Sequence, residues 1–134
     1  MTVRTASCSC GKLSIAVEGE PVRVSICHCL ECQKRTGSVF GAQARFRREQ
    51  VVSMQGAFTS YARVGDEGGR AEFHFCPACG SIVHYDIDSQ PGLVAIPVGA
   101  FADPSFPAPQ VSVYEERRHR WVLLPDDGSL QHID

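Results

Sequence analysis

Seven cysteines in three short clusters constrain this 134-residue chain more than any other feature of its sequence. The densest cluster is Cys27-His28-Cys29-Leu30-Glu31-Cys32, a C-x-C-x2-C pattern. The others are the pairs Cys8/Cys10 and Cys76/Cys79, each followed directly by a glycine. Closely spaced thiolates bind zinc tetrahedrally at about 2.3 Å with little cost in loop closure. Seven thiols therefore divide into a closed set of four and a set of three that leaves one tetrahedral position vacant.

Two other uses of these cysteines are weaker interpretations. A disulfide framework is typical of secreted chains with an even cysteine count, whereas the count here is odd and residues 1–7 lack the apolar segment of a signal peptide. A thioredoxin-like role for Cys76-Pro77-Ala78-Cys79 needs a βαβ setting, and no helical pattern follows this motif. We therefore expect a cytoplasmic protein whose reduced cysteines bind zinc.

The charge and hydropathy of the chain argue against nucleic acid and membrane partners. The formal net charge is −2 at pH 7, and it becomes more negative if the thiols ionise around two zinc ions. Proteins that bind nucleic acid non-specifically carry a basic surface, which a chain of this charge does not favour. Local basic clusters such as 34–35 and 117–120 are more often solvated surface than binding sites. No apolar run approaches the roughly 20 residues of a membrane-spanning helix.

Short stretches with strand periodicity follow one another along the chain. Apolar and polar residues alternate at 13–18, 22–26 and 70–76, and the stretch 93–99 is nearly continuously apolar. Turn signals separate roughly ten such stretches, which is typical of an all-β domain. Residues 30–35 are the one helical candidate. We predict a single all-β domain over residues 1–134, built of short antiparallel strands with at most one short helix.

Spacing alone leaves the ligand sets of the two sites open. Residues 13–17 and 22–26 are predicted to form a hairpin that brings Cys8 and Cys10 near the C-x-C-x2-C loop. The closed site then combines Cys8 and Cys10 either with Cys27 and Cys29 or with the distant pair at 76 and 79. In the second arrangement one ion closes a loop of most of the domain and contributes strongly to folding.

Taken together, three cysteine motifs resemble the glutathione-dependent formaldehyde-activating enzyme family, also known by centromere protein V. They are Cys8-x-Cys10-Gly11, Cys27-His28-Cys29-x-x-Cys32 and Phe75-Cys76-x-x-Cys79-Gly80. Two further segments, Arg35-Thr36-Gly37-Ser38 and Gly99-Ala100-Phe101-Ala102-Asp103-Pro104 followed by Trp121, are similar to segments of the same family. The resemblance extends from about residue 7 to Trp121.

The resemblance implies a β-tent zinc-binding fold with two zinc ions per chain. It assigns a structural zinc to Cys8, Cys10, Cys76 and Cys79. It assigns a catalytic zinc, which we expect to be the more labile ion, to Cys27, Cys29 and Cys32. The implied activity is the addition of glutathione to formaldehyde to give S-hydroxymethylglutathione, which is classed among carbon–sulfur lyases by its reverse. The expected partner is a small-molecule thiol or thiol–aldehyde adduct, such as that of glutathione. The alternative is a non-catalytic zinc module that binds a partner.

Most notable residues other than the cysteines have ordinary structural interpretations. Three histidines are interpreted as surface or core residues rather than as fourth ligands, although each could serve as a proton carrier: His28, His74 and His84. Seven aromatic residues are interpreted as core: Phe40, Phe46, Phe58, Phe73, Phe75, Tyr85 and Trp121. For the first three the alternative is that they wall a pocket near the second zinc. Lys34 and Arg35 directly follow the third cysteine and are the candidates to attract an anionic thiol.

Overall fold

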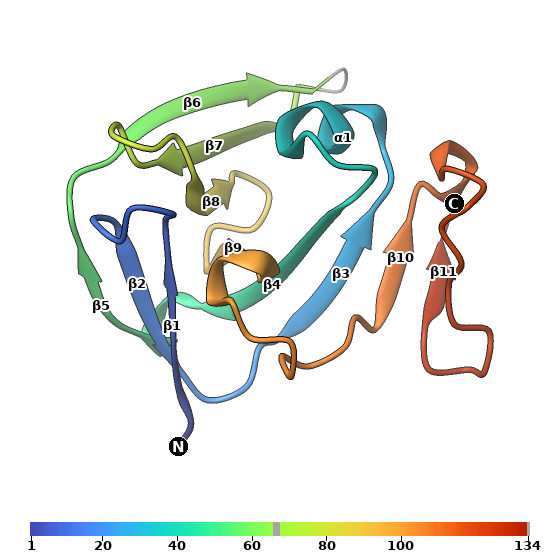
Figure 1. Ribbon diagram of the computed structural model, residues 1–134, viewed down its shortest axis with the longest axis horizontal. Coiled ribbons are helices and arrows are strands. Elements are labelled where there is room, and N and C mark those ends of the chain that lie inside the picture. Colours follow the sequence, from blue (N-terminus) through green and yellow to red (C-terminus); the bar gives the residue numbers. More distant parts are fainter. Residues whose placement is uncertain (66–67, 134) are drawn as a thin grey trace. The chain divides into compact units, whose positions relative to one another are not determined.

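The computed structural model describes residues 1–65 and 68–133 (Figure 1). Within these ranges lie eleven β-strands, three 3-10 helices and one α-helix, α1 (Leu30–Thr36), so the prediction of an all-β fold with at most one short helix is confirmed. The chain forms two compact units. The first unit comprises Met1–Val22 and Ala44–Phe106, and the second unit comprises Arg23–Gln43 and Pro107–Asp134. The single domain over 1–134 stays a prediction, and residues 66, 67 and 134 of that range lie outside the described residues.

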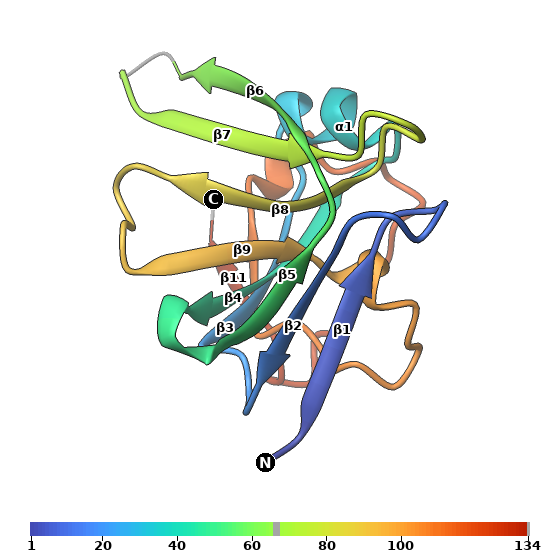
Figure 2. The same ribbon diagram turned by 90° about the vertical axis from the view of Figure 1, so that its left-hand side faces the viewer.

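Two groups of hydrogen-bonded strands make up the first unit (Figure 2). Strands β1 (Val3–Ser7), β2 (Ser14–Glu18) and β5 (Val51–Gln55) form an antiparallel sheet in the order β1-β2-β5. The second group runs in the order β6-β7-β8-β9, and its neighbours are also antiparallel. Its members are β6 (Thr59–Val64), β7 (Arg70–Phe75), β8 (Ile82–Ile87) and β9 (Leu93–Pro97).

Alternate strand positions supply the interior of this unit, as the period-two pattern predicts. Ile15 and Val17 on β2 are fully buried. Phe73, Tyr85 and Ala95 form a buried cluster on β7, β8 and β9, with the two aromatic ring centroids 4.9 Å apart. The core prediction is therefore confirmed for Phe73 and Tyr85.

Strand β9 is shorter than the predicted stretch 93–99. It ends at Pro97, and the chain continues as the 3-10 helix η2 (Val98–Phe101). Phe101 is buried against Phe46, with ring centroids 6.1 Å apart, and Phe46 itself is fully buried. The apolar character of the stretch therefore comes partly from a buried turn rather than from a strand alone.

The second unit contains α1 and three strands that lie side by side (Figure 1). These are β3 (Arg23–Cys27), β10 (Val111–Val113) and β11 (Gln131–Ile133). Both pairs, β3 with β10 and β10 with β11, are parallel, whereas we expected antiparallel strands. Parallel neighbours need a long connection, and these strands are far apart along the chain. Strand β11 was not predicted, because all three of its residues are exposed and carry no apolar alternation.

The predicted hairpin between 13–17 and 22–26 does not form. Strand β2 pairs with β1 and β5, and β3 pairs with β10. The remaining elements are β4 (Gly41–Arg47), η1 (Arg48–Gln50) and η3 (Glu115–Arg117). None of the helices in the described ranges has the length and apolar character needed to cross a bilayer.

Candidate metal centres

Four cysteines of the first unit come together although Cys10 and Cys76 are 66 residues apart along the chain. The sulfur atoms of Cys8, Cys10, Cys76 and Cys79 all lie within 4.8 Å of one another. Cys10 Sγ is 3.6 Å from both Cys8 Sγ and Cys76 Sγ. Two tetrahedral thiolate ligands of one zinc ion are about 3.8 Å apart, as follows from a zinc–sulfur bond of about 2.3 Å. The four thiols therefore have the spacing of a complete tetrahedral zinc site.

Tight turns present both cysteine pairs of this group. Gly11 and Gly80 adopt φ values of 81° and 83°, in the left-handed region that glycine tolerates best. Their backbone N–H groups donate to the carbonyl oxygens of Cys8 and Cys76 over 3.0 and 2.8 Å, which closes each turn. The N–H of Leu13 donates to Cys8 Sγ over 3.2 Å. Each glycine after a cysteine pair thus permits the turn that aims the thiols inward.

The three cysteines of the C-x-C-x2-C cluster form a separate group in the second unit. Cys27 ends β3, Cys29 is the N-cap residue of α1, and Cys32 lies in the first turn of that helix. Their sulfur atoms also lie within 4.8 Å of one another. Cys29 Sγ accepts a hydrogen bond from the N–H of Cys32 over 3.3 Å, in the position where a serine or aspartate usually caps a helix. In the described part of the chain, no histidine, aspartate or glutamate joins either group.

The structure therefore resolves the choice that spacing left open. It brings Cys8 and Cys10 together with Cys76 and Cys79, and it gathers Cys27, Cys29 and Cys32 by themselves. The three-cysteine group leaves one tetrahedral position without a protein ligand from the described residues. Cys27 is buried and Cys29 and Cys32 are half-buried, whereas the four-cysteine group combines buried Cys8 and Cys76 with exposed Cys10 and Cys79.

Two of the three thiols have pKa values that are shifted in opposite directions. The hydrogen bond from Cys27 lowers the pKa of Cys32 to about 5 against the opposing effect of burial, and Cys29 and the guanidinium of Arg35 lower it further. The same hydrogen bond, together with burial, raises the pKa of Cys27. Such a group can lose all three protons only if a cation compensates for the charge, and a bound metal ion has this effect.

His28 lies between two of these cysteines but bonds elsewhere. It is fully buried, and its Nε2 is 3.0 Å from the hydroxyl oxygen of Ser112 on β10. Its ring also packs against Phe40, with ring centroids 5.7 Å apart. Burial is the main cause that lowers the pKa of His28. The interpretation of His28 as a core histidine is therefore confirmed, and its bond to Ser112 anchors the cysteine loop to β10.

Gln33 fastens α1 to the rest of this unit. Its Nε2 donates to the carbonyl oxygens of His28 and Arg117 over 2.9 and 3.1 Å. Its Oε1 lies 2.9 Å from Nε2 of His119. We missed Gln33 and Ser112 in the sequence, because their partners are up to 86 residues away along the chain and no local pattern marks such a contact.

His74 and His84 are core histidines on neighbouring strands. His74 Nδ1 lies 2.7 Å from the hydroxyl oxygen of Ser60, and its Nε2 lies 2.8 Å from a carboxylate oxygen of Asp86. His84 is 3% exposed, and burial lowers its pKa to about 4. Phe58 packs edge-on against both imidazole rings, with centroid distances of 4.7 and 5.3 Å.

The core prediction is wrong for two aromatic residues. Phe58 is 44% exposed, because the residue lies just before the edge strand β6 and packs on the histidines with only part of its ring. Trp121 is 70% exposed, because it lies in an irregular segment, where its ring makes an edge contact with His119. Phe40 and Phe75 are half-buried.

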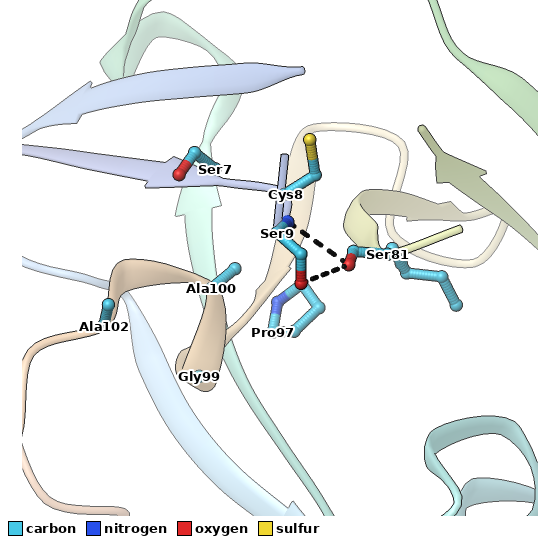
Figure 3. A pocket seen from close by; sticks show the side chains of 9 residues that line it. Ser7, Cys8, Ser9, Ser81, Pro97, Gly99, Ala100 and Ala102 are labelled. Carbon is cyan, nitrogen blue, oxygen red and sulfur yellow. Dashed lines mark hydrogen bonds between the residues drawn. The ribbon is translucent and has the colours of Figure 1, made fainter. Parts of the chain in front are cut away.

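A cavity of about 460 Å³ opens beside Cys8 in the first unit (Figure 3). Figure 3 shows Ser9 and Ser81 on its wall, where the hydroxyl of Ser81 donates to that of Ser9 over 3.3 Å. Gly99 and Ala100 of η2 face the same space, and none of the lining side chains is charged. The small side chains of these residues leave the space open.

Comparisons with known proteins place the chain in a family. The family model described as glutathione-dependent formaldehyde-activating enzyme matches residues 3–117. A crystal structure of a Rhodobacter sphaeroides protein is similar, with 25% sequence identity and a TM-score of 0.57 over 75% of this chain and 91% of that chain. No curated protein matches the chain. Since the family match covers most of the chain and all seven cysteines, this protein belongs to the glutathione-dependent formaldehyde-activating enzyme family.

Proposed function

We propose that this protein is a zinc-dependent enzyme of the carbon–sulfur lyase type that acts on thiol–aldehyde adducts. The proposed reaction joins glutathione and formaldehyde to give S-hydroxymethylglutathione, or cleaves that adduct in reverse. One observation carries the proposal, namely that three thiols gather without a fourth protein ligand in the described residues of a chain that belongs to this family. A set of three ligands is typical of a catalytic zinc site, whereas a set of four is typical of a structural one.

The donor atoms fit zinc at both groups. Thiolates are soft ligands that suit zinc, and the sulfur spacing of 3.6 Å in the four-cysteine group is close to the tetrahedral value. Cys27, Cys29 and Cys32 would hold the catalytic ion. When bound there, zinc supplies Lewis acidity and stabilises a thiolate near neutral pH.

The residues around the three thiols hold them in place and leave the site reachable. Cys29 caps α1 and Cys32 follows one turn later, so a single short helix orients two of the three sulfur atoms. Gln33 and Ser112 bind this helix and the preceding loop to the rest of the unit. Because Cys29 and Cys32 are only half-buried, a small thiol or aldehyde has access to them from solvent.

The four-cysteine group has a different proposed role. Cys8 and Cys10 follow β1, while Cys76 and Cys79 form the turn between β7 and β8. A zinc ion held by all four would therefore cross-link distant parts of the first unit. With its four protein ligands the ion would have no position for substrate, and we assign it to stability.

The test is the rate at which glutathione and formaldehyde reach equilibrium with their adduct, followed by proton NMR. The protein with two zinc ions should accelerate this exchange above the uncatalysed rate. Cys32→Ser should return the rate to background while the far-UV circular dichroism spectrum and one zinc ion remain. If the protein holds two zinc ions and still gives the background rate, the proposed reaction is wrong, and the binding-module alternative becomes the better explanation.

A further inference from the structure

We propose that the positive charge of Arg35 compensates for the negative charge of the three-cysteine site. We further propose that Gly41 provides the space in which the guanidinium of Arg35 lies beside Cys32. This inference rests on the proposed function, because it takes zinc as the occupant of the three thiols. It assigns Arg35 to the retention of zinc, whereas the sequence pattern suggested that Arg35 attracts an anionic substrate.

The geometry of α1 separates Arg35 from the neighbouring cation. Cys32 and Arg35 are three residues apart and therefore lie on the same face of the helix. Arg35 Nη2 donates to Cys32 Sγ over 3.8 Å. Arg35 is half-buried, whereas Lys34 is exposed. Of these two consecutive basic residues, only Arg35 therefore directs its charge at the metal-binding sulfur.

Gly41 explains how a guanidinium fits beside the thiol. It is a buried residue at the start of β4, and it does not have the positive φ that would by itself require glycine. A Cβ atom at this position would lie 3.2 Å from Arg35 Nη2 and 3.6 Å from Cys32 Cβ. The first of these contacts is tighter than ordinary van der Waals packing. Glycine at position 41 thus leaves room for the arginine rather than for a turn.

The charge of the site explains why a cation is needed there. Three thiolates around a divalent ion leave one net negative charge, and the thiols that carry it are buried or half-buried. A charge removed from water is costly unless a nearby group of opposite sign compensates for it. Arginine suits this role better than lysine, because its guanidinium is permanently charged, planar and weakly hydrated.

The experiment measures zinc release to a chromogenic chelator at fixed pH and low ionic strength. Arg35→Gln keeps most of the side-chain length and removes the charge. Lys34→Gln is the matched control, because it removes the same charge from the adjacent residue. Substitution of a residue that hydrogen-bonds a metal ligand typically lowers the metal affinity by roughly 10- to 100-fold. We expect Arg35→Gln to lower the affinity of the more labile zinc by this factor, and Lys34→Gln to lower it by less than about twofold.

Two further variants separate charge from packing. Arg35→Lys should recover part of the lost affinity, because it restores the charge without the planar group. Gly41→Ala should weaken zinc retention in the same direction as Arg35→Gln, because the new methyl group displaces the guanidinium. Circular dichroism and release of the second, tighter zinc ion should stay unchanged in all four variants.

The outcomes distinguish this inference from the proposed function. If the parent protein releases two zinc ions in separate phases and Arg35→Gln behaves like the parent or like Lys34→Gln, the role of Arg35 is wrong while the catalytic zinc stands. If Gly41→Ala retains zinc as the parent does, the packing part of the inference is wrong. If the parent holds no second zinc ion, both the proposed function and the role of Arg35 fail together.

Discussion

Removing the four-cysteine site should lower the free energy of unfolding about twice as much as removing the three-cysteine site. The two sites cross-link segments of very different length. Cys10 and Cys76 are 66 residues apart, whereas the three-cysteine group spans only Cys27–Cys32. A cross-link lowers the entropy of the unfolded chain, and the effect grows with the length of the loop that it closes. For loops of these two lengths the same relation gives about 4 kcal/mol and about 2 kcal/mol at 25 °C.

The perturbation is a pair of double variants that each remove two ligands. Cys10→Ser/Cys79→Ser removes one thiol from each pair of the four-cysteine group, and both residues are exposed, so little core packing is lost. Cys29→Ser/Cys32→Ser removes two half-buried thiols from the other group. A typical domain has a free energy of unfolding of about 5–15 kcal/mol, so a loss of about 4 kcal/mol removes a large part of it.

The assay is urea unfolding followed by circular dichroism, with zinc content measured on the same samples. We expect the first double variant to lose about 4 kcal/mol of unfolding free energy and to melt at a temperature lower by more than roughly 10 °C. The second should lose about 2 kcal/mol or less and keep one zinc ion. Equal losses in the two variants would refute the reasoning, because they would mean that the three-cysteine group stabilises the fold as much as the long cross-link does.

Three shorter predictions follow from the same geometry. In a chelator titration zinc should leave in two phases, with the β-structure lost only in the second, because the three-cysteine group offers fewer thiolates than the four-cysteine group. Simultaneous zinc release and unfolding would contradict this prediction. Gln33→Ala should lower the free energy of unfolding by about 1–3 kcal/mol and speed zinc release in the first phase, because it removes the hydrogen bonds to the carbonyl oxygens of His28 and Arg117. Gln33→Glu is the comparison, because it keeps the size of the side chain but loses the N–H donor of these two bonds. Because burial depresses the pKa of His84 to about 4, this histidine contributes stability that is fully present above pH 6.5 and is lost as the pH falls from 6.5 towards 4. His84→Gln should therefore lose less stability than the parent over this range, and parallel pH profiles would contradict the reasoning.

The sequence predicts the metal groups better than it predicts the strand partners. Ligands of one ion must be close, so cysteine spacing already limits how seven thiols can be arranged. Strand periodicity shows which face of a strand is buried but does not name its neighbour, and the predicted hairpin of 13–17 with 22–26 was wrong for that reason. One hydrogen-bonded neighbour of β3 is β10, which lies more than 80 residues further along the chain. The bond between His28 and Ser112 depends on that pairing and is equally hidden in the sequence.

The difference between a long and a short cross-link also bears on how the activity of such a protein could change. The three-cysteine group depends on one loop, one short helix and a few bonds to β10 and the 117–119 segment. We therefore expect substitution of its thiols to change the proposed chemistry at a smaller cost in stability than loss of the four-cysteine group. The four-cysteine group joins the end of β1 to the β7–β8 turn, and its loss affects strands that lie far apart in the sequence. We therefore expect substitutions of Arg35 and Gly41 to change metal retention with little loss of stability, because neither residue takes part in the long cross-link. By the same reasoning, Gly11 and Gly80 tolerate little change, since their turns hold the ligands on which the first unit depends.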